Sequence, residues 1–495
     1  MRNTFFFLIL LLFGTTVHAQ WIQKGMDIDG ETADDQSGRS ISMSSNGNTI
    51  AIGAYKNDGA GTDAGHVRIY EWNGTSWTQK GLDIDGEAAD DRSGYSVSMS
   101  SDGNTIAIGA VNNDGTASNA GHVRVYEWND TAWIQKGLDI DGEANGDNSG
   151  FSVSMSSDGN TLAIGAWYND GTGINSGNTR IYEWNGMAWT QKGAEIDGEG
   201  PNDLSGYSVS ISSDGSTIAI GANLNDGSGA NSGHSRVYEW NGIAWTQKGM
   251  DIDGESTDDN SGRSVSMSSN GNTIAIGAYK NDGTGTDAGH VRIYEWNGTG
   301  WTQKGTDIDG EASDDQSGAV SLSSDGNTIA VGAFFNDGTA TNAGHVRVYE
   351  WNGTGWTQKG LDIDGEAADD LSGYSISLSS DGSSLAIGAY LNDGTATDAG
   401  HVRVYEINTV GVLENSFGNN LLVYPNPTKG NFSIDLRENF NSIKLSIVDI
   451  NGRLIQTTDY NSSQIINLNI AGPTGIYLLT LESAKQRAVI RIVKQ

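Results

Sequence analysis

The sequence predicts an all-β protein: a seven-bladed β-propeller of four-stranded blades over residues 20–409, closed by its N-terminal strand, followed by a small C-terminal β-sandwich. Three observations lead to this prediction. They are a repeat of 56 residues, turn signals between short strand-like runs within each repeat, and a change of composition near residue 410. No segment shows the 3.6-residue apolar period of an amphipathic helix.

Residues 1–19 are interpreted as a secretory signal peptide. Arg2 precedes an apolar run, and the segment ends in Val-His-Ala, so we expect cleavage between Ala19 and Gln20. The chain has no cysteine, so an exported product must gain its stability from a packed core rather than from disulfides. No later stretch approaches 18 consecutive apolar residues, and no transmembrane segment is expected in the mature chain.

The pattern W-x-Q-K-G-x-D-I-D-G-E marks the repeats. A fixed period of this kind is typical of propellers, solenoids and arrays. The spacing is 56 residues five times and 55 once, and the repeats begin at Trp21, Trp77, Trp133, Trp189, Trp245, Trp301 and Trp356.

The second repeat illustrates the expected strands. Asp102-Gly103 separates two strand-like runs, and a further turn follows the third run; such turns supply the positive φ angles of tight hairpins. We therefore expect antiparallel strands at 96–100, 105–109, 123–127 and 133–137. Bulky and small side chains alternate along the first two strands, which favours blades packed face to face.

The two ends of the repeat region predict how the ring closes. The mature chain opens with a strand of the fourth type at 21–28, whereas the last repeat stops after a strand of the third type at 402–406. We expect these two strands to pair, which leaves no exposed terminal blade. The alternative, an open array of sheets, would need distinctive caps, and none is visible in the sequence.

Charge divides the chain into two parts. Residues 20–410 contain 56 acidic and 19 basic side chains, a net charge of −37, whereas residues 411–495 have a net charge of +2. Such a negative region repels phosphate backbones and anionic lipid headgroups, so nucleic acid is not an expected partner. Cations remain candidate ligands.

Three motifs of the repeat, at 93–98, 108–110 and 121–126, resemble the FG-GAP repeat of integrin-type propellers. Integrin-type repeats usually carry an Asp-rich calcium loop between their first two strands. Here that connection is the tight turn Ser101-Asp102-Gly103, so the resemblance does not imply calcium at this position.

The C-terminal region contains Tyr424-Pro425-Asn426-Pro427 and later a Gly475-Ile476-Tyr477 segment. With these motifs it resembles the sorting domain of type IX secretion cargo in Bacteroidetes-type bacteria. The resemblance implies a sorting domain at 421–495 behind a linker at 410–420, recognition by the type IX secretion machinery, and passage through the periplasm to the outer cell surface or the medium. A plain accessory β domain is the alternative. The residues that carry the resemblance are Tyr424, Pro425, Asn426, Pro427, Gly430, Gly452, Gly475, Tyr477 and Lys494.

The long loops of all repeats are expected on one face of the propeller, where they would form a crown of carboxylates. Calcium takes six to eight oxygen ligands and is the candidate cofactor, although the loop lacks the full ligand pattern of an EF-hand. The alternative is that these residues form turns and keep the protein soluble. In the second repeat the candidate ligands are Asp83, Asp85, Glu87, Asp90 and Asp91.

Six repeats place a histidine at the start of the third strand, and the third repeat has Asn178 there. Equivalent positions on different blades lie far apart, so we expect these histidines to form hydrogen bonds rather than to bind zinc. Arg124 and Tyr126, with their equivalents, are expected to be structural.

The repeats offer seven similar surfaces and no unique cluster of a nucleophile and a base, so no catalytic residues are expected. The leading hypothesis is an exported, cell-surface or released, non-catalytic binding or adhesion propeller that engages an extracellular protein or glycan. The alternatives are a polysaccharide-acting enzyme that uses loop carboxylates, and a structural surface-layer protein.

Overall fold

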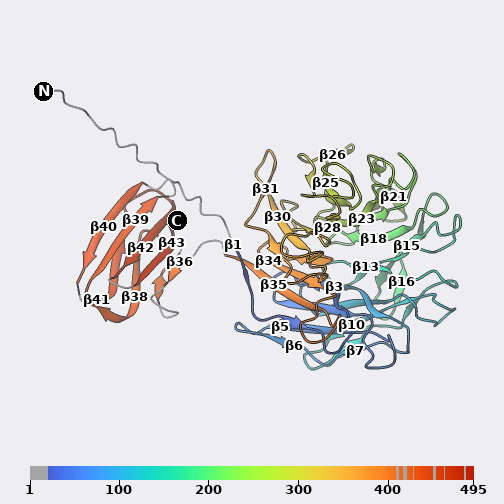
Figure 1. Ribbon diagram of the computed structural model, residues 1–495, viewed down its shortest axis with the longest axis horizontal. Helices are drawn as coiled ribbons and strands as arrows, with labels where there is room; N and C mark the ends of the chain where they lie inside the picture. Colours follow the sequence, from blue (N-terminus) through green and yellow to red (C-terminus); the bar gives the residue numbers. More distant parts are fainter. Residues whose placement is uncertain are drawn as a thin grey trace. The chain divides into compact units, whose positions relative to one another are not determined.

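The computed structural model describes residues 20–408, 412–415, 421–426, 428–449, 453–461, 463–483 and 486–494. All regular elements in these ranges are β-strands (Figure 1). The described residues contain no helix with the length and apolar character needed to cross a membrane. The chain divides between Ile407 and Asn408 into two compact units. Ala19, on one side of the predicted cleavage point, lies outside the described residues.

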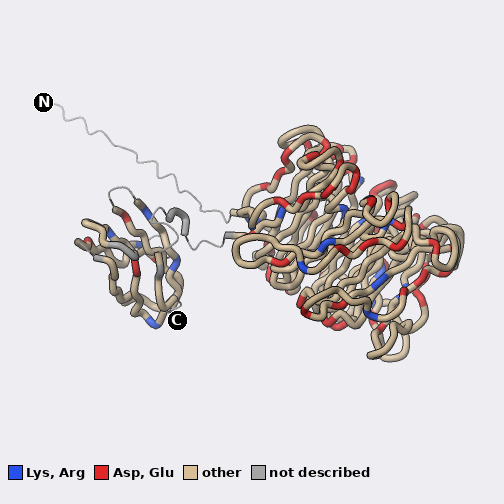
Figure 2. Tube along the Cα trace, turned by 90° about the horizontal axis from the view of Figure 1, so that it is seen from below, with Lys and Arg blue, Asp and Glu red and all other residues tan. Residues whose placement is uncertain are grey.

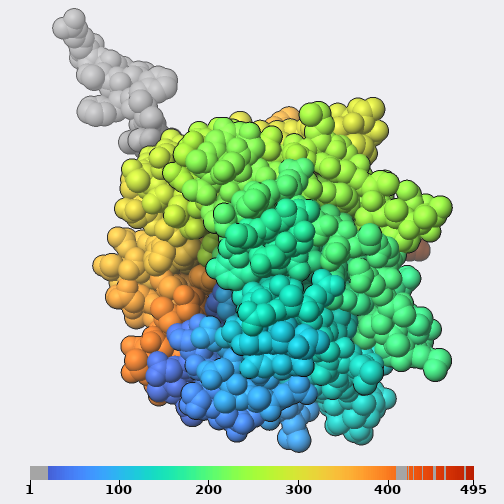
Figure 3. Space-filling view, turned by 90° about the vertical axis from the view of Figure 1, so that its right-hand side faces the viewer, coloured from blue at the N-terminus to red at the C-terminus, as the bar shows by residue number. Residues whose placement is uncertain are grey.

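The N-terminal unit contains seven antiparallel sheets, and Figure 3 shows the repeats following one another around a wheel, with the first repeat beside the last. The innermost strands are β3 (Ser37–Met43), β8 (Ser93–Met99), β13 (Ser152–Met155), β18 (Ser205–Ile211), β23 (Ser261–Met267), β28 (Ser317–Leu322) and β33 (Ser375–Leu378). The second strands are β4 (Thr49–Ala54), β9 (Thr105–Ala110), β14 (Thr161–Ala166), β19 (Thr217–Ala222), β24 (Thr273–Ala278), β29 (Thr328–Ala333) and β34 (Ser384–Ala389).

The third strands are β5 (His66–Trp72), β10 (His122–Trp128), β15 (Asn178–Trp184), β20 (His234–Trp240), β25 (His290–Trp296), β30 (His345–Trp351) and β35 (His401–Asn408). Outside them lie pairs of short strands: β1 (Gln20–Gln23) and β2 (Ile28–Asp29), β6 (Trp77–Gln79) and β7 (Ile84–Asp85), β11 (Trp133–Gln135) and β12 (Ile140–Asp141), β16 (Trp189–Gln191) and β17 (Ile196–Asp197), β21 (Trp245–Gln247) and β22 (Ile252–Asp253), β26 (Trp301–Gln303) and β27 (Ile308–Asp309), β31 (Trp356–Gln358) and β32 (Ile363–Asp364).

The outer edge of each sheet differs from the single strand predicted at 133–137. Both β11 and β12 pair with β10, and the chain leaves the sheet between them. Gly137 lies in this interruption with a φ of 87°, a left-handed conformation that ends an extended strand. The fourth strand of each blade is therefore present, but in two pieces.

The core lies between neighbouring sheets. Val97, Met99 and Ile106 of the second sheet pack against Ala51 and Val67 of the first, so bulky side chains face a small one as predicted. Burying each large apolar side chain contributes about 1.5–3 kcal/mol. The small face also carries serines: Ser98 Oγ accepts a hydrogen bond from the N–H of Met155 in the third sheet, at 2.9 Å.

The N-terminal strands complete the last sheet. Ile28 pairs with Val402 of β35, and the N–H of Lys24 donates to the carbonyl of Val404 at 2.7 Å. The first and last sheets also contact each other, because Ser375 Oγ donates to the carbonyl of Gly38 at 2.6 Å. The N-terminal strand thus lies beside β35, where the sequence predicts it.

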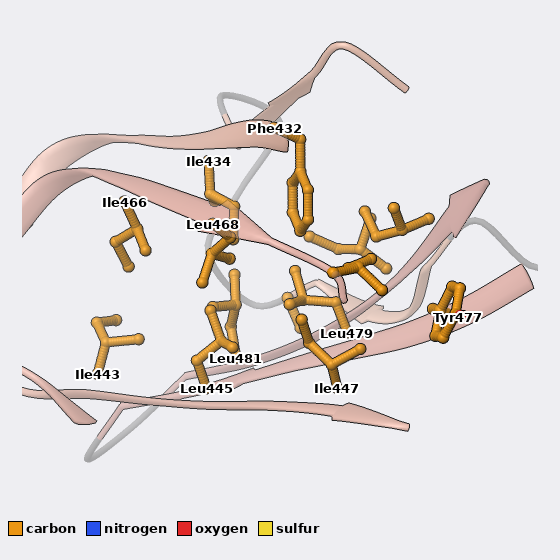
Figure 4. Packing of buried hydrophobic residues seen from close by; sticks show 14 of the residues in the cluster. Phe432, Ile434, Ile443, Leu445, Ile447, Ile466, Leu468, Tyr477, Leu479 and Leu481 are labelled. Carbon is orange, nitrogen blue, oxygen red and sulfur yellow. The ribbon is translucent and has the colours of Figure 1, made fainter. Parts of the chain in front are cut away.

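The C-terminal unit is a two-sheet sandwich. One sheet has the order β36 (Val412–Asn415), β43 (Arg487–Lys494), β42 (Gly475–Glu482), β39 (Ile443–Asp449) and β40 (Leu454–Tyr460), and the other β37 (Leu422–Tyr424), β38 (Asn431–Phe440) and β41 (Ser463–Asn469). Figure 4 shows Phe432 and Ile434 of one sheet packed towards Leu445 and Leu479 of the other. Strand β36 lies within the predicted linker 410–420 but pairs with β43, so this sheet begins before residue 421.

The predicted sorting residues hold the final strand. Asn426 donates from its side chain to the carbonyl of Arg491 at 2.7 Å and accepts from the N–H of Val493 at 2.8 Å. Lys494 Nζ donates to the carbonyl of Ile470 at 2.8 Å. Tyr477 is buried and donates to the carbonyl of Pro473 at 2.7 Å.

The other sorting residues have less specific roles. Tyr424 is exposed, and Pro425 follows it through a cis peptide bond. Gly430 and Gly475 both have positive φ angles, of 121° and 153°. Pro427 and Gly452 lie outside the described residues.

Candidate functional site

The acidic loops of the N-terminal unit carry much of its negative charge (Figure 2). In the second repeat, Asp91 is buried and its Oδ2 accepts hydrogen bonds from the N–H of Ala88 at 3.0 Å and from Asn113 Nδ2 at 3.1 Å. This carboxylate therefore fixes the loop. Asp90 is exposed and has a φ of 66°, as a turn residue. Asp85 is exposed and lies opposite His66 in the strand register.

Asp83 and Glu87, from the same loop, lie in two different clusters. Glu87 Oε2 is 3.9 Å from His122 Nδ1, and Asp139 of the following loop completes this cluster. Asp83 instead lies 3.9 Å from His66 Nδ1, beside Glu31. We call such a group a loop triad. The other triads are Glu199–His234–Asp251, Glu255–His290–Asp307 and Glu366–His401–Asp27. In the sixth repeat, Glu311 Oε2 likewise lies 3.9 Å from His345 Nδ1.

The histidine of each loop triad is almost fully buried and uncharged near neutral pH. The side chain of His122 is 2% exposed, and its Nε2 has no hydrogen-bond partner. Burial lowers the pKa of His122 and the charge of Arg124 lowers it further, which outweighs the opposing effect of Asp139 and Glu87. Nε2 is equally unpartnered in His66, His234, His290 and His345, so the hydrogen-bonding role predicted for these histidines is not observed at this atom. The carboxylates of the triad instead lie near the other ring nitrogen, Nδ1.

Arginines of the third strands anchor the triads. Arg124 lies with its guanidinium 5.6 Å from the ring centre of Tyr126 and 3.7 Å from Glu87 Oε1, and it donates to the carbonyl of Asp85 at 2.6 Å. The third repeat differs, because Asn178 Nδ2 donates directly to Glu195 Oε2 at 2.8 Å. A neutral amide thus makes the contact that a neutral imidazole leaves open.

The donor set of a loop triad decides which cation it suits. One nitrogen and two carboxylate oxygens lie within 4.8 Å of one another. Neutral imidazole is a ligand for zinc-class transition metals, whereas calcium prefers six to eight oxygens. In the tight turn 101–103, the carboxylate already has partners within the turn. Asp102 Oδ1 accepts hydrogen bonds from Ser100 Oγ at 2.6 Å and from the N–H of Asn104 at 3.0 Å.

A second candidate site lies at the axis, in a cavity of about 250 Å³ that the innermost strands of all seven sheets line. In β8 the pairing with β9 skips from Ser93 to Ser96, so Gly94 and Tyr95 form a bulge and Tyr95 lines the cavity. Bulges commonly re-aim a side chain next to a functional site. The residues at this bulge position are Arg39, Tyr95, Phe151, Tyr207, Arg263 and Tyr374.

The sixth sheet lacks this residue. Ala319 pairs with Gly332 as Ser96 pairs with Gly109, so β28 is one residue shorter and contributes no bulge side chain. This shortening corresponds to the single repeat interval of 55 residues. The sixth sheet therefore lines the cavity with the small side chain of Ala319 and with Val320 instead of a large bulge residue.

Two arginines extend into this cavity. The Arg39 guanidinium lies 4.5 Å from the ring centre of Tyr95 and 4.6 Å from that of Tyr374. Arg263 lies 4.5 Å from the ring centre of Tyr279 and 5.5 Å from that of Tyr374. Burial alone would raise the pKa of Tyr374, but the charges of Arg39 and Arg263 lower it on balance.

The axial cavity was not predicted from the sequence, although a signal was present. Aligning the repeats with one another shows that the residue after Ser-Gly changes while its neighbours stay the same. The residue after the second strand changes in the same way. Its aromatic members are Tyr55, Trp167, Tyr279, Phe334 and Tyr390.

Seven sheets around an axis and a separate β-sandwich define a propeller with an accessory domain. The family described as FG-GAP repeat matches residues 78–126, 135–182 and 247–294, and the family described as Secretion system C-terminal sorting domain matches residues 422–495. The chain thus carries FG-GAP repeats and a type IX sorting domain, which implies export to the cell surface or secretion.

No curated protein matches the sequence. Among solved structures, the chain is similar to hydrazine synthase of Kuenenia stuttgartiensis, with 14% identity, coverage of 77% of this chain and 96% of that chain, and a TM-score of 0.48. It is also similar to the periplasmic gluconolactonase PpgL of Pseudomonas aeruginosa, with 12% identity, coverage of 86% and 99%, and a TM-score of 0.46.

Proposed function

We propose that this chain is an exported, non-catalytic binding propeller that engages an extracellular ligand at the axial cavity on its loop face. The observation that carries the proposal is where the repeats differ. Their cores are nearly identical, whereas the bulge position holds arginine, tyrosine, phenylalanine or no residue. Varied side chains gathered in one concave site are typical of ligand recognition.

The lining of the cavity favours binding over polysaccharide cleavage. Glycoside hydrolysis generally uses two carboxyl groups that flank the scissile bond. The lining residues all lie in the described part of the chain, and none of them is aspartate or glutamate. A structural surface-layer protein would have no need for an asymmetric cavity.

The test is to measure binding and product release on the same panel of glycans and extracellular proteins with the mature chain, residues 20–495. We expect binding without turnover, and loss of binding in Trp167→Ala, which removes the ring stacked on the lining residue Phe151. Met187→Gln is the matched control and should bind normally, because Met187 lies in a hairpin turn and is 88% exposed. Turnover of any panel member would contradict the non-catalytic function.

We further propose that the cation of this protein is a zinc-class divalent ion at the histidine-containing loop triads, in place of the calcium expected from the loop sequence. The uncharged imidazole whose Nδ1 faces two carboxylates supports this choice. At a hundredfold excess over Kd, each independent site would stabilise the fold by about 2.7 kcal/mol. Zinc should therefore raise the melting temperature more than calcium, chelator or matched sodium chloride.

Variants separate this effect from screening of surface charge. Glu87→Gln together with Asp139→Asn should remove the contribution of one triad, whereas Asp130→Asn, in the turn after β10, should leave the zinc effect unchanged. Equal melting curves in zinc and in chelator would rule out the metal and leave the triads as solvated loop groups.

A further inference from the structure

The two arginines in the axial cavity lack the carboxylate partners that the arginines of the third strands have. Each third-strand arginine lies near a glutamate, as Arg68 does with Glu31 at 3.6 Å and Arg292 with Glu255 at 3.5 Å. Among the described residues, no ion pair joins Arg39 or Arg263 to a carboxylate. This is unusual in a chain with 62 acidic side chains. A guanidinium presents a fork of donors that fits a carboxylate, so both groups are suited to an anionic ligand.

The positive charges of the two guanidinium groups repel each other. Both belong to the lining of one cavity of about 250 Å³, and the charge of Arg39 opposes that of Arg263. Like charges in a partly dehydrated site repel strongly, and an anion between them would relieve the repulsion. The aromatic rings beside them contact their faces but supply no full negative charge.

Aromatic rings form another part of the wall. Phe151 is stacked on Trp167 with 4.2 Å between ring centres, and it lies 4.9 Å from Tyr207 and 5.2 Å from Tyr95. Among these aromatic residues, Tyr95, Phe151 and Tyr207 line the cavity, and they offer an apolar surface for the face of a pyranose.

Size and charge limit the ligand further. Pockets for drug-sized molecules measure roughly 300–1,000 Å³, so a cavity of about 250 Å³ holds about one sugar ring. The chain has a net charge of −34, which repels a long polyanion but permits a single charge to reach a local pair of arginines.

We propose that the axial cavity binds the carboxylate-bearing terminal sugar of a glycan, a uronic acid unit, with its carboxylate between Arg39 and Arg263 and its ring against Phe151. This inference rests on the proposed binding function and names its ligand class. It uses the positions at which the repeats differ and needs no ion in the loop triads.

The test is calorimetric titration of the mature chain with glucuronate, glucose and acetate. We expect glucuronate to bind at least tenfold more tightly than glucose, which lacks the charge, and than acetate, which lacks the ring. Arg39→Gln and Arg263→Gln should each weaken glucuronate binding at least tenfold. Arg39→Lys keeps the charge without the fork and should have a smaller effect, and it serves if Arg39→Gln fails to fold.

Lys280→Gln is the matched control, because it removes a positive charge next to Tyr279 but outside the cavity lining. It should bind glucuronate normally. Absent glucuronate binding, equal affinity for acetate, or unchanged binding in the double arginine variant would overturn the inference. If another member of the panel of glycans and proteins binds, and Trp167→Ala abolishes that binding, the proposed binding function is supported but the uronic acid inference is wrong. If no panel member binds, both the proposed function and the inference are wrong.

Discussion

Single residues decide what each repeat contributes beyond its core. At the start of the third strand, histidine leaves two carboxylates unbridged, whereas Asn178 bonds one of them directly. At the bulge position, the side chain decides what the repeat contributes to the cavity lining: Arg39 contributes a positive charge, and Phe151 contributes an aromatic ring that stacks. The repeats therefore differ at few positions within a nearly constant frame.

The buried histidines make the folding stability depend on pH. Burial lowers the pKa of His234, His290 and His401 to about 4, against about 6.5 in an unfolded chain. Between these values the unfolded state binds protons that the folded state excludes. This contribution is therefore complete above about pH 6.5 and is lost as the pH falls towards 4.

His290→Asn, which copies Asn178, should make the fall in melting temperature between pH 6.5 and 4 shallower than in the parent protein. The charged groups around His290, which are Glu255, Asp259, Arg292 and Asp307, remain in both proteins, so the comparison isolates the histidine. Met187→Gln is the control and should follow the parent. Superimposable pH profiles would show that His290 titrates alike in both states.

At the level of strands, local sequence signals predicted most of the fold. Turn pairs such as Asp102-Gly103 act within a few residues, so the strand positions could be derived without knowing the partners. The division of the outer strand at Gly137 and the bulge at Tyr95 could not be derived, because both depend on contacts with other strands. The loop triads combine residues of neighbouring repeats and the axial cavity combines residues of all seven, and the sequence alone did not group them.

The strand β1 should be a major determinant of stability. Trp21 is buried within the last sheet and donates from its indole to the carbonyl of Lys359 at 2.9 Å. Trp21→Ala should lower the free energy of unfolding by about 3–5 kcal/mol. Ile22→Ala, at a neighbouring position that is 48% exposed, should change it by less than about 0.5 kcal/mol.

Removing residues 20–29 should cost more than Trp21→Ala, because it also removes buried Ile28 and exposes the edge of β35. Denaturant unfolding measures all three variants. An unchanged midpoint after the deletion would contradict the role assigned to the pairing with β35.

The whole molecule consists of two units with different tasks and different charge. The N-terminal unit carries the repeats and the candidate sites, and the C-terminal unit carries the sorting domain and its own apolar core. The motif residues of the sorting domain act first on its own fold, because Asn426 fixes β43.

Ending the chain after Asn408 should therefore leave the propeller folded, with a melting transition close to that of the full chain, but retain it in the cell envelope. Cell fractionation and immunoblotting measure this result, with the full chain as the control. Recovery of the truncated protein outside the cell would contradict the assigned role of the tail in sorting.

The pairing of β1 and β2 with β35 also affects the order of events during synthesis. The strands that are translated first find their partners last: Thr395 Oγ1 donates to the carbonyl of Gly30, 365 positions earlier in the chain. The wheel therefore cannot be finished on a partly made chain, and two unpaired edges persist until the seventh repeat emerges. Because the sorting domain follows β35, every chain that bears this domain also bears the strand that finishes the wheel. The sorting domain therefore also marks those chains that contain all the strands of the propeller.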